Sequence, residues 1–347
     1  MASASDQTIY GLTSDELKIS SELEEILSKQ EIITEIDVAD SQPSIFIYSN
    51  QRLSLSKTIP VLHTFNFIVE SEITSLVTQN EKEYYISKIN IRVDDIEKLK
   101  ASQTNINELV TSILNGEFNI LCSIFVLSYL ENFNMREILL FITLAKYKEQ
   151  LTSSSDYHAT IGLFIQYSHI TTLLRQYFLE KFDPTLPSRN LEAIEAKILE
   201  ELTNVEAISE DNLLRLILEI MKNTQRTNYF LDKNIISLKI HTNKIDYEFT
   251  GIVPEIEAFV YHPDFSGVHL RMDKVSRGGL RWSNRKADYR DEVKALMIAQ
   301  EAKNAVIVPK GAKGGFIINE DRPSKAEFEK YYRLFIKALL RLVDNIV

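Results

Sequence analysis

Two pairs of adjacent glycines, each beside basic side chains, are the most informative feature of this sequence. The first pair lies in residues 277–282 (Arg-Gly-Gly-Leu-Arg-Trp) and the second in residues 311–315 (Gly-Ala-Lys-Gly-Gly), with Gln300 and Lys303 between them. Glycine lets backbone N–H groups come close to a ligand, and lysine and arginine supply positive charge for carboxylates. The pattern therefore indicates a site that holds a small dianion.

Lys313, in the second glycine segment, is the candidate catalytic residue. Several cations around one cavity repel each other, so we expect each to have a lowered pKa, most of all a lysine that is removed from water. A lysine that is neutral at the working pH can act as a general base. The other cations would orient the carboxylates of the substrate, and the glycines would leave room for it. The candidate substrate-binding residues are Arg277, Gly278, Gly279, Gln300 and Lys303.

A purely structural interpretation of these residues competes with the functional one. A glycine pair in basic surroundings is usually only a turn, and residues 311–315 lack the Gly-Lys-Ser/Thr ending of a phosphate loop. We interpret His269 as a structural histidine and expect no metal site, because no second histidine or carboxylate lies at metal-ligand spacing from it. Four further basic residues are expected on a solvated helix face: Arg285, Lys286, Arg290 and Lys294.

The elements that must position these residues alternate between strand and helix. Strand-like segments precede the first glycine pair at 235–240, 257–261 and 268–272. We predict a glycine turn, a helix over about 286–302, a buried strand over 305–308, and a second glycine turn that carries Lys313. Gln300 and Lys303 are three residues apart, so they share one face of the helix. This order is typical of an α/β domain.

We predict further α/β and helical segments in the remainder of the chain. Seven of the ten glycines lie at or after Gly251, which indicates a boundary near residue 230. We predict a helical segment over 1–30, a small α/β unit over 31–100, a helical region over 101–228 and an α/β domain over 229–347. Strands of the small unit are expected at 44–49, 65–71 and 84–91.

Two sequence patterns mark helix starts. Asn134 with Glu137 reads as an N-cap with an acidic residue at the third helical position, and Ser324 with Glu327 reads as a capping box. The second pattern opens a final helix with apolar residues at helical spacing, and neither Gly nor Pro follows it before Val347. The apolar residues are Phe328, Tyr332, Phe335, Ile336, Leu339, Leu340 and Val343.

Composition bounds the class of protein. The chain has 347 residues, 44% of them hydrophobic, and a formal net charge of -10, which argues against nucleic acid or an anionic membrane as the main partner. Residues 270–313 nevertheless hold eleven Lys/Arg against five Asp/Glu, so positive charge gathers at the glycine motifs. Cys122 is the single cysteine, in an apolar run where core packing is its expected role. Without a recognisable signal peptide or membrane span, we expect a cytoplasmic protein.

The basic glycine segments also resemble a known family. Residues 267–271, 277–283 and 303–316, taken together, closely resemble the large bacterial NAD-specific glutamate dehydrogenases. More weakly, residues 55–91 resemble the last ACT-like module of that family, and the helices up to about Pro184, including Lys181-Phe182-Asp183-Pro184, resemble its helical region. The resemblance implies that 31–100 is an ACT-like module and 229–347 part of a substrate-binding domain.

The resemblance further implies a role for each candidate residue. Lys313 would be the catalytic lysine, Lys303 and Gln300 would meet the α-carboxylate of glutamate, and Arg277 would meet the side-chain carboxylate. Arg277 stands where the smaller hexameric enzymes use lysine, so its role follows from position only. The family also requires an aspartate downstream of the lysine segment and a nucleotide domain with a glycine fingerprint, and the sequence contains no G-x-G triplet.

We therefore interpret the chain as the front portion of an NAD-dependent glutamate dehydrogenase and expect it to be inactive alone. The expected partners are L-glutamate or 2-oxoglutarate and either further copies of this chain or a chain with the missing nucleotide domain. The NAD site is expected outside these residues. One alternative is a non-enzymatic remnant or partner subunit that binds a dicarboxylate or serves in oligomerisation. A second is an anion or nucleic-acid binder that uses the basic segment, which predicts steep salt dependence.

Overall fold

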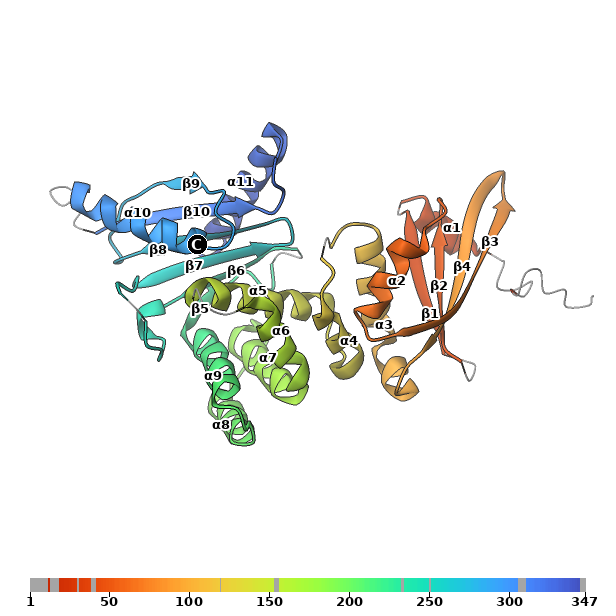
Figure 1. Ribbon diagram of the computed structural model, residues 1–347, viewed down its shortest axis with the longest axis horizontal. Helices are drawn as coiled ribbons and strands as arrows, with labels where there is room; N and C mark the ends of the chain where they lie inside the picture. The colour runs from red at the N-terminus through yellow and green to blue at the C-terminus, as the bar shows by residue number, and fades with distance from the viewer. Residues whose placement is uncertain are drawn as a thin grey trace, which may run out of the picture. The chain divides into compact units, whose positions relative to one another are not determined.

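The computed structural model describes residues 12, 19–29, 31–38, 42–118, 120–152, 156–231, 234–249, 251–304 and 310–343. Helices and strands are mixed along the chain, as the sequence predicts (Figure 1). The chain divides into two compact units, Met1–Ile138 and Leu139–Val347. The finer division at residues 30, 100 and 228 stays a prediction.

The first unit is built on an antiparallel four-stranded sheet with strand order β1-β2-β4-β3. The strand expected at 44–49 is confirmed as β2, and the one expected at 65–71 begins only at Ile68. Phe65 and Phe67 instead stack on each other in the core, with ring centroids 5.7 Å apart. The strands are β1 Ile32–Asp37, β2 Ser44–Ser49, β3 Ile68–Gln79 and β4 Lys82–Arg92. The helices are α1 Ser21–Leu27, α2 Leu55–His63, α3 Ile96–Leu114, η1 Ser123–Phe125 and α4 Val126–Glu131.

A group of helices leads into the second sheet. The predicted cap of the first of them is confirmed, because the Glu137 N–H donates to Asn134 Oδ1 (2.9 Å) and the Asn134 N–H donates to the Glu137 carboxylate (2.9 Å). Lys181, from the motif quoted above, donates to the carbonyl oxygen of Met221 (2.9 Å) at the end of α9. The helices are α5 Met135–Thr152, α6 Tyr157–Gln166, α7 Ser168–Phe182, α8 Leu191–Leu202 and α9 Ile208–Asn223.

The second sheet has six strands in the order β5-β6-β7-β8-β10-β9 (Figure 1). All neighbours are antiparallel except β9 and β10, which are parallel. The predicted capping box of the final helix is confirmed, and that helix ends at Leu340. The elements are β5 Thr224–Thr227, β6 Ile236–Ile240, η2 Thr242–Lys244, β7 Ile256–His262, β8 Phe265–Arg271, β9 Leu280–Trp282, α10 Tyr289–Asn304, β10 Ala312–Ile318 and α11 Lys325–Leu340.

Helices cover both faces of this sheet. On one face, the ring of Tyr147 in α5 lies 5.2 Å from that of Phe259 in β7, and α10 packs against β8 and β10. On the other face, the Phe335 ring of α11 stacks on Phe316 of β10 at 5.5 Å. The two helices that flank the lysine segment in sequence therefore lie on opposite faces of the strand that carries it.

The prediction that both glycine segments are turns was wrong. Residues 312–315 are the first half of β10, and Arg277 forms a parallel bridge with Gly311 so that the first glycine segment runs extended beside it. The strand expected at 305–308 lies outside the described residues. The preference of glycine for turns gave the wrong prediction, because these glycines allow close contact between segments distant in sequence and do not change the direction of the chain.

Candidate functional site

Lys313 lies near the start of β10, on the face of the sheet that α10 covers. Side chains alternate along a strand, so Lys313 and Gly315 point to the same face. A Cβ placed on Gly315 would lie 2.4 Å from Cγ2 of Val293 in α10, so glycine permits the close approach of this helix. The partner of Lys313 in β8 is Leu270, which belongs to the buried core. Lys313 itself is partly buried, at the edge of the packed helix–sheet contact.

The backbone of Arg277 and Gly278 is held directly against the start of β10. The Arg277 N–H donates to the Lys310 carbonyl oxygen (3.3 Å), and the Ala312 N–H donates to the Arg277 carbonyl oxygen (3.0 Å). A Cβ on Gly278 would lie 1.3 Å from the carbonyl oxygen of Ala312, a distance that no side chain can occupy. Gly278 is therefore required by contact with the chain's own backbone.

Gly279 leaves open space beside the candidate catalytic lysine. The Gly314 N–H donates to its carbonyl oxygen (3.0 Å), which fixes the segment in place. Among the described residues, the one atom within 4.0 Å of a Cβ placed on Gly279 is Nζ of Lys313. Gly279 is exposed, so the Lys313 ammonium group borders a stretch of accessible backbone. None of the side chains that the structure describes blocks the approach of a small ligand to the ammonium group from this side.

The two arginines of the first glycine segment differ in their partners. Arg281 forms an ion pair with Glu292 of α10 (3.3 Å), which also accepts a hydrogen bond from the Ser283 hydroxyl (2.5 Å). Arg277 is exposed, and no hydrogen bond or ion pair of its guanidinium group with another described residue is found. The charge of Arg281 is thus matched within the fold, whereas that of Arg277 remains accessible to an anion.

Helix α10 runs antiparallel to β10, so its end lies toward Lys313. The Tyr289 hydroxyl contacts the Ser266 hydroxyl (3.2 Å) level with Ile317, and Val293 lies over Gly315. Four residues of helix rise about 6 Å and two residues of strand about 6.6 Å, so continuing this register places Gln300 level with the start of β10. Gln300 is partly buried. Lys303 lies in the last turn of α10, and its side chain is outside the described residues.

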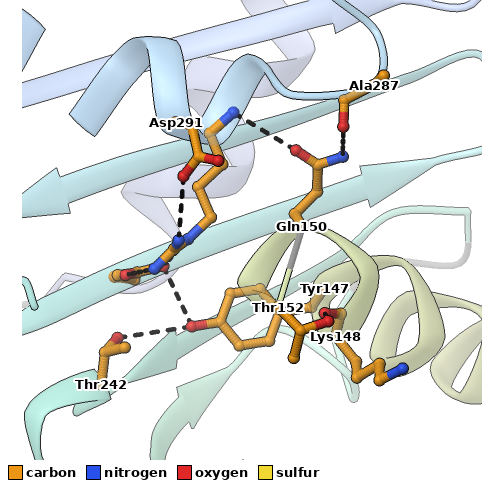
Figure 2. A network of polar contacts seen from close by, with 9 residues as sticks. Tyr147, Lys148, Gln150, Thr152, Thr242, Ala287 and Asp291 are labelled. Carbon is orange, nitrogen blue, oxygen red and sulfur yellow. Dashed lines mark hydrogen bonds and ion pairs between the residues drawn. The ribbon is translucent and has the colours of Figure 1, made fainter. Parts of the chain in front are cut away.

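The start of α10 is anchored by a buried ion pair (Figure 2). Arg290 donates to Glu257 of β7 through Nε (3.0 Å) and Nη2 (2.5 Å), and the two residues are 3% and 0% exposed. Tyr147 of α5 donates its hydroxyl proton to the same carboxylate (3.1 Å). Gln150 of α5 donates to the Ala287 carbonyl oxygen (3.0 Å) and accepts from the Arg290 N–H (3.4 Å). These bonds join α5, β7 and α10.

Burial and the Glu257 carboxylate shift the pKa values of Arg290 and Tyr147 in this network. Burial opposes the charge of Arg290, but the adjacent Glu257 carboxylate outweighs it and raises the arginine pKa. Burial, and then the negative charge of Glu257, raises the pKa of Tyr147 well above its usual value, so this phenol stays protonated. The network therefore fixes where α10 begins, and hence the register that brings Gln300 toward Lys313.

The interpretation of Arg290 as part of a solvated helix face was wrong, and the structure divides that set of four basic residues. Arg285 and Lys286 are exposed and form ion pairs with Asp288 and Asp321, respectively. Sequence reasoning missed Glu257, although an acidic residue in an otherwise apolar strand was an available signal of a buried partner.

His269 lies partly buried on the opposite face of the sheet, and its structural role stays a prediction. Burial, and then the positive charge of Arg271, lowers its pKa to about 4, so its imidazole is neutral near pH 7. Within the part of the chain that the structure describes, no group of three His, Cys, Asp or Glu residues is placed to hold a metal ion.

In the part that the structure describes, the second sheet differs in strand pairing from the parallel sheets that commonly bind dinucleotides. Five of the six strands in the second sheet are linked by antiparallel pairing, and the one parallel pair is not joined by a glycine-rich turn at a helix N-terminus. A pyrophosphate group would need such a turn. In the same described ranges, no helix is both long and apolar enough to cross a membrane.

Comparison with known proteins places this mixed helix-and-sheet chain in a family. Residues 197–347 match the family described as bacterial NAD-glutamate dehydrogenase, catalytic domain. An NAD-specific glutamate dehydrogenase of Pseudomonas aeruginosa is 34% identical over 325 residues, which cover 86% of this chain and 20% of that protein. Proteins of the same name from Halomonas elongata and Mycobacterium tuberculosis are 39% and 38% identical, over 62% and 46% of this chain and 14% and 11% of their own lengths.

The chain belongs to the family of large bacterial NAD-specific glutamate dehydrogenases. It spans a fifth or less of the length of the relatives named above. The matched region contains every candidate site residue, from Arg277 to Lys313.

Proposed function

We propose that this chain supplies the substrate-binding side of an NAD-dependent glutamate dehydrogenase, which converts L-glutamate to 2-oxoglutarate and ammonia. One observation carries the proposal: Nζ of Lys313 borders the exposed backbone of Gly279, 4.0 Å from where a Cβ would lie. This is the geometry expected if a small ligand is to approach a reactive lysine closely. The names of the relatives support the choice of glutamate over other dicarboxylates.

Each candidate residue has a proposed role. Lys313 is the proton-transfer group, because its ammonium borders accessible backbone and forms no hydrogen bond or ion pair with another described residue. Arg277 takes the side-chain carboxylate, since its guanidinium is exposed and unpaired among the described residues. Gln300 and Lys303, at the end of α10, take the α-carboxylate. Gly278 brings Arg277 against β10, and Gly279 keeps the approach to Lys313 open.

We further propose that the NAD site lies outside these residues and that the assembled enzyme is an oligomer. Residues 31–100 are proposed to be an ACT-like regulatory module. The antiparallel sheet of these residues supports this, and so does helix α3, which continues beyond residue 100 and is bonded to the edge strand β1 through Asn115 Oδ1, which accepts from the Ile32 N–H (3.0 Å). The second contact is from the Thr34 N–H to the Thr111 hydroxyl (3.2 Å).

Binding of 2-oxoglutarate to the full chain tests the substrate assignment. We expect weak binding in ligand-observed NMR, which Arg277→Ala should weaken at least about tenfold, because a charge-assisted pair contributes about 1.5–3 kcal/mol. Lys313→Met should also weaken it while the circular dichroism spectrum stays unchanged. Arg322→Gln removes another exposed charge and is the matched control. Equal binding by all variants, or equal binding of phosphate and 2-oxoglutarate by the wild type, would refute the assignment.

A further inference from the structure

A pocket of about 420 Å³ lies on the face of the second sheet opposite Lys313. Its floor is formed by residues of β6, β7 and β8, and its wall by the end of α11 and the residues that follow. Ile256 and Ala258 alternate with Glu257, so they point away from the buried ion pair and toward α11. The pocket is therefore separate from the candidate active site. Its size is within the range of small-molecule sites.

Positive charge gathers at one side of this pocket. Lys239, Arg271 and Lys274 line it, and the ten described residues that line it include no Asp or Glu. Arg271 and Lys274 are held together, because Nη2 of Arg271 donates to the Lys274 carbonyl oxygen (2.7 Å). Burial, and then the positive charge of Lys244, lowers the pKa of the nearby His241; Glu255 acts in the opposite direction, and Lys239 and Lys274 contribute less. The charged side chains described as lining the pocket are therefore all positive.

The other side of the pocket is apolar and open. Six of the ten lining residues are aliphatic or alanine, and Leu340 and Val343 in the wall are 60% and 52% exposed. Exposed aliphatic side chains at the rim of a cavity gain from contact with an apolar ligand group. Cations beside such a surface favour a ligand that has both an anionic and an apolar end.

We propose that this pocket binds a small amphipathic carboxylate, a short aliphatic chain that ends in one carboxylate group. The carboxylate lies against Arg271 and Lys274, and the chain packs on Ile256, Leu340 and Val343. A dicarboxylate such as 2-oxoglutarate fits less well, because its second charge would face the aliphatic wall. A phosphate ion fits less well because it leaves that wall uncovered.

Such a ligand would bind the reverse side of the strands that carry the lysine. Arg271 pairs with Ala312, and His269 pairs with Gly314, so the pocket residues are the strand partners of the two neighbours of Lys313. The inference does not depend on the proposed dehydrogenase function. It stands on the pocket, its charge and its apolar wall alone.

Hexanoate is a suitable probe, with hexan-1-ol and acetate as comparisons that lack the charge and the chain. Calorimetry on the full chain should give saturable binding of hexanoate and much weaker binding of the other two. Arg271→Gln should weaken hexanoate binding about ten- to a hundredfold through loss of a charge-assisted contact. Leu340→Asp should weaken it by at least as much, because it adds a negative charge to the wall. Leu340 is exposed, so the fold should tolerate this change.

Lys337→Gln is the control, because Lys337 is exposed on the same helix and does not line the pocket. It should leave hexanoate binding unchanged. Three results would each overturn the proposal: no saturable binding of hexanoate, equal binding of hexan-1-ol, or unchanged binding by Leu340→Asp. A wild-type affinity for 2-oxoglutarate that Leu340→Asp abolishes would also overturn it, because it would place the dicarboxylate in this pocket. Loss of 2-oxoglutarate binding in Arg277→Ala alone would leave this inference untouched.

Discussion

Breaking the buried ion pair between Arg290 and Glu257 should destabilise the second unit more than removing the whole pair. In Arg290→Met, the Tyr147 hydroxyl (3.1 Å) is the one donor among the described residues that the fully buried Glu257 carboxylate keeps. In Glu257→Leu, the Arg290 guanidinium, at 3% exposure, loses both of its bonds to Glu257 and retains the longer ion pair with Asp291 (3.8 Å). Each single change should cost about 3–5 kcal/mol, the usual effect of leaving one buried charge unpaired.

The double variant Arg290→Met/Glu257→Leu should recover most of this loss. Neither charge remains, and two apolar side chains of similar length fill the space between α10 and β7. Its free energy of unfolding should lie within about 2 kcal/mol of the wild type, against the roughly 6–10 kcal/mol that two independent losses would give. Tyr147→Phe, which removes one hydrogen bond, should cost only about 1 kcal/mol.

Urea denaturation followed by circular dichroism measures these free energies. The lone tryptophan, Trp282, lies 43% exposed in β9 and can report on the second sheet in the same experiment. If a single variant is unfolded in buffer, the double variant still tests the reasoning, because it should be folded. Additive losses, or single variants within about 1 kcal/mol of the wild type, would show that the pair does not anchor α10.

Two further predictions follow from other contacts. Gly278→Ala should lower the free energy of unfolding by at least about 3 kcal/mol, because its Cβ would lie 1.3 Å from the Ala312 carbonyl oxygen. Gly279→Ala should stay within about 1 kcal/mol of the wild type, because its Cβ would lie 4.0 Å from Lys313 Nζ. Thermal denaturation compares the two, and similar melting temperatures would contradict the packing argument. Burial, and then the positive charge of Lys222, lowers the pKa of Lys181 to about 8. Because of this lysine, the wild type should become more stable as pH rises from about 8 to about 10.5. The unfolded chain holds the lysine proton over that range while the folded chain has released it, so stability increases with pH by about 1 kcal/mol after allowance for solvent screening. Lys181→Met should lack this increase, and parallel pH profiles for the two proteins would refute it.

Patterns among neighbouring residues correctly predicted the caps of two helices and the bounds of one strand. The Asn134–Glu137 and Ser324–Glu327 caps need only residues three apart, so the sequence alone contains both partners of each bond. Strand β2 was predicted at its observed bounds because an unbroken β-branched and aromatic run has few alternatives. The family, too, was recognisable from the strings of residues around Arg277 and Lys313.

Only the tertiary structure decided what the glycines and Arg290 do. Gly278 meets Ala312 across more than thirty residues of chain, and Arg290 meets Glu257 across 33, so no local pattern pairs either residue with its partner. A glycine pair is compatible with a turn and with an extended strand, and an arginine on a helix is compatible with water and with a buried carboxylate. The partner far away in sequence selects between these states, because steric exclusion and pairing of buried charge act through space and not along the chain.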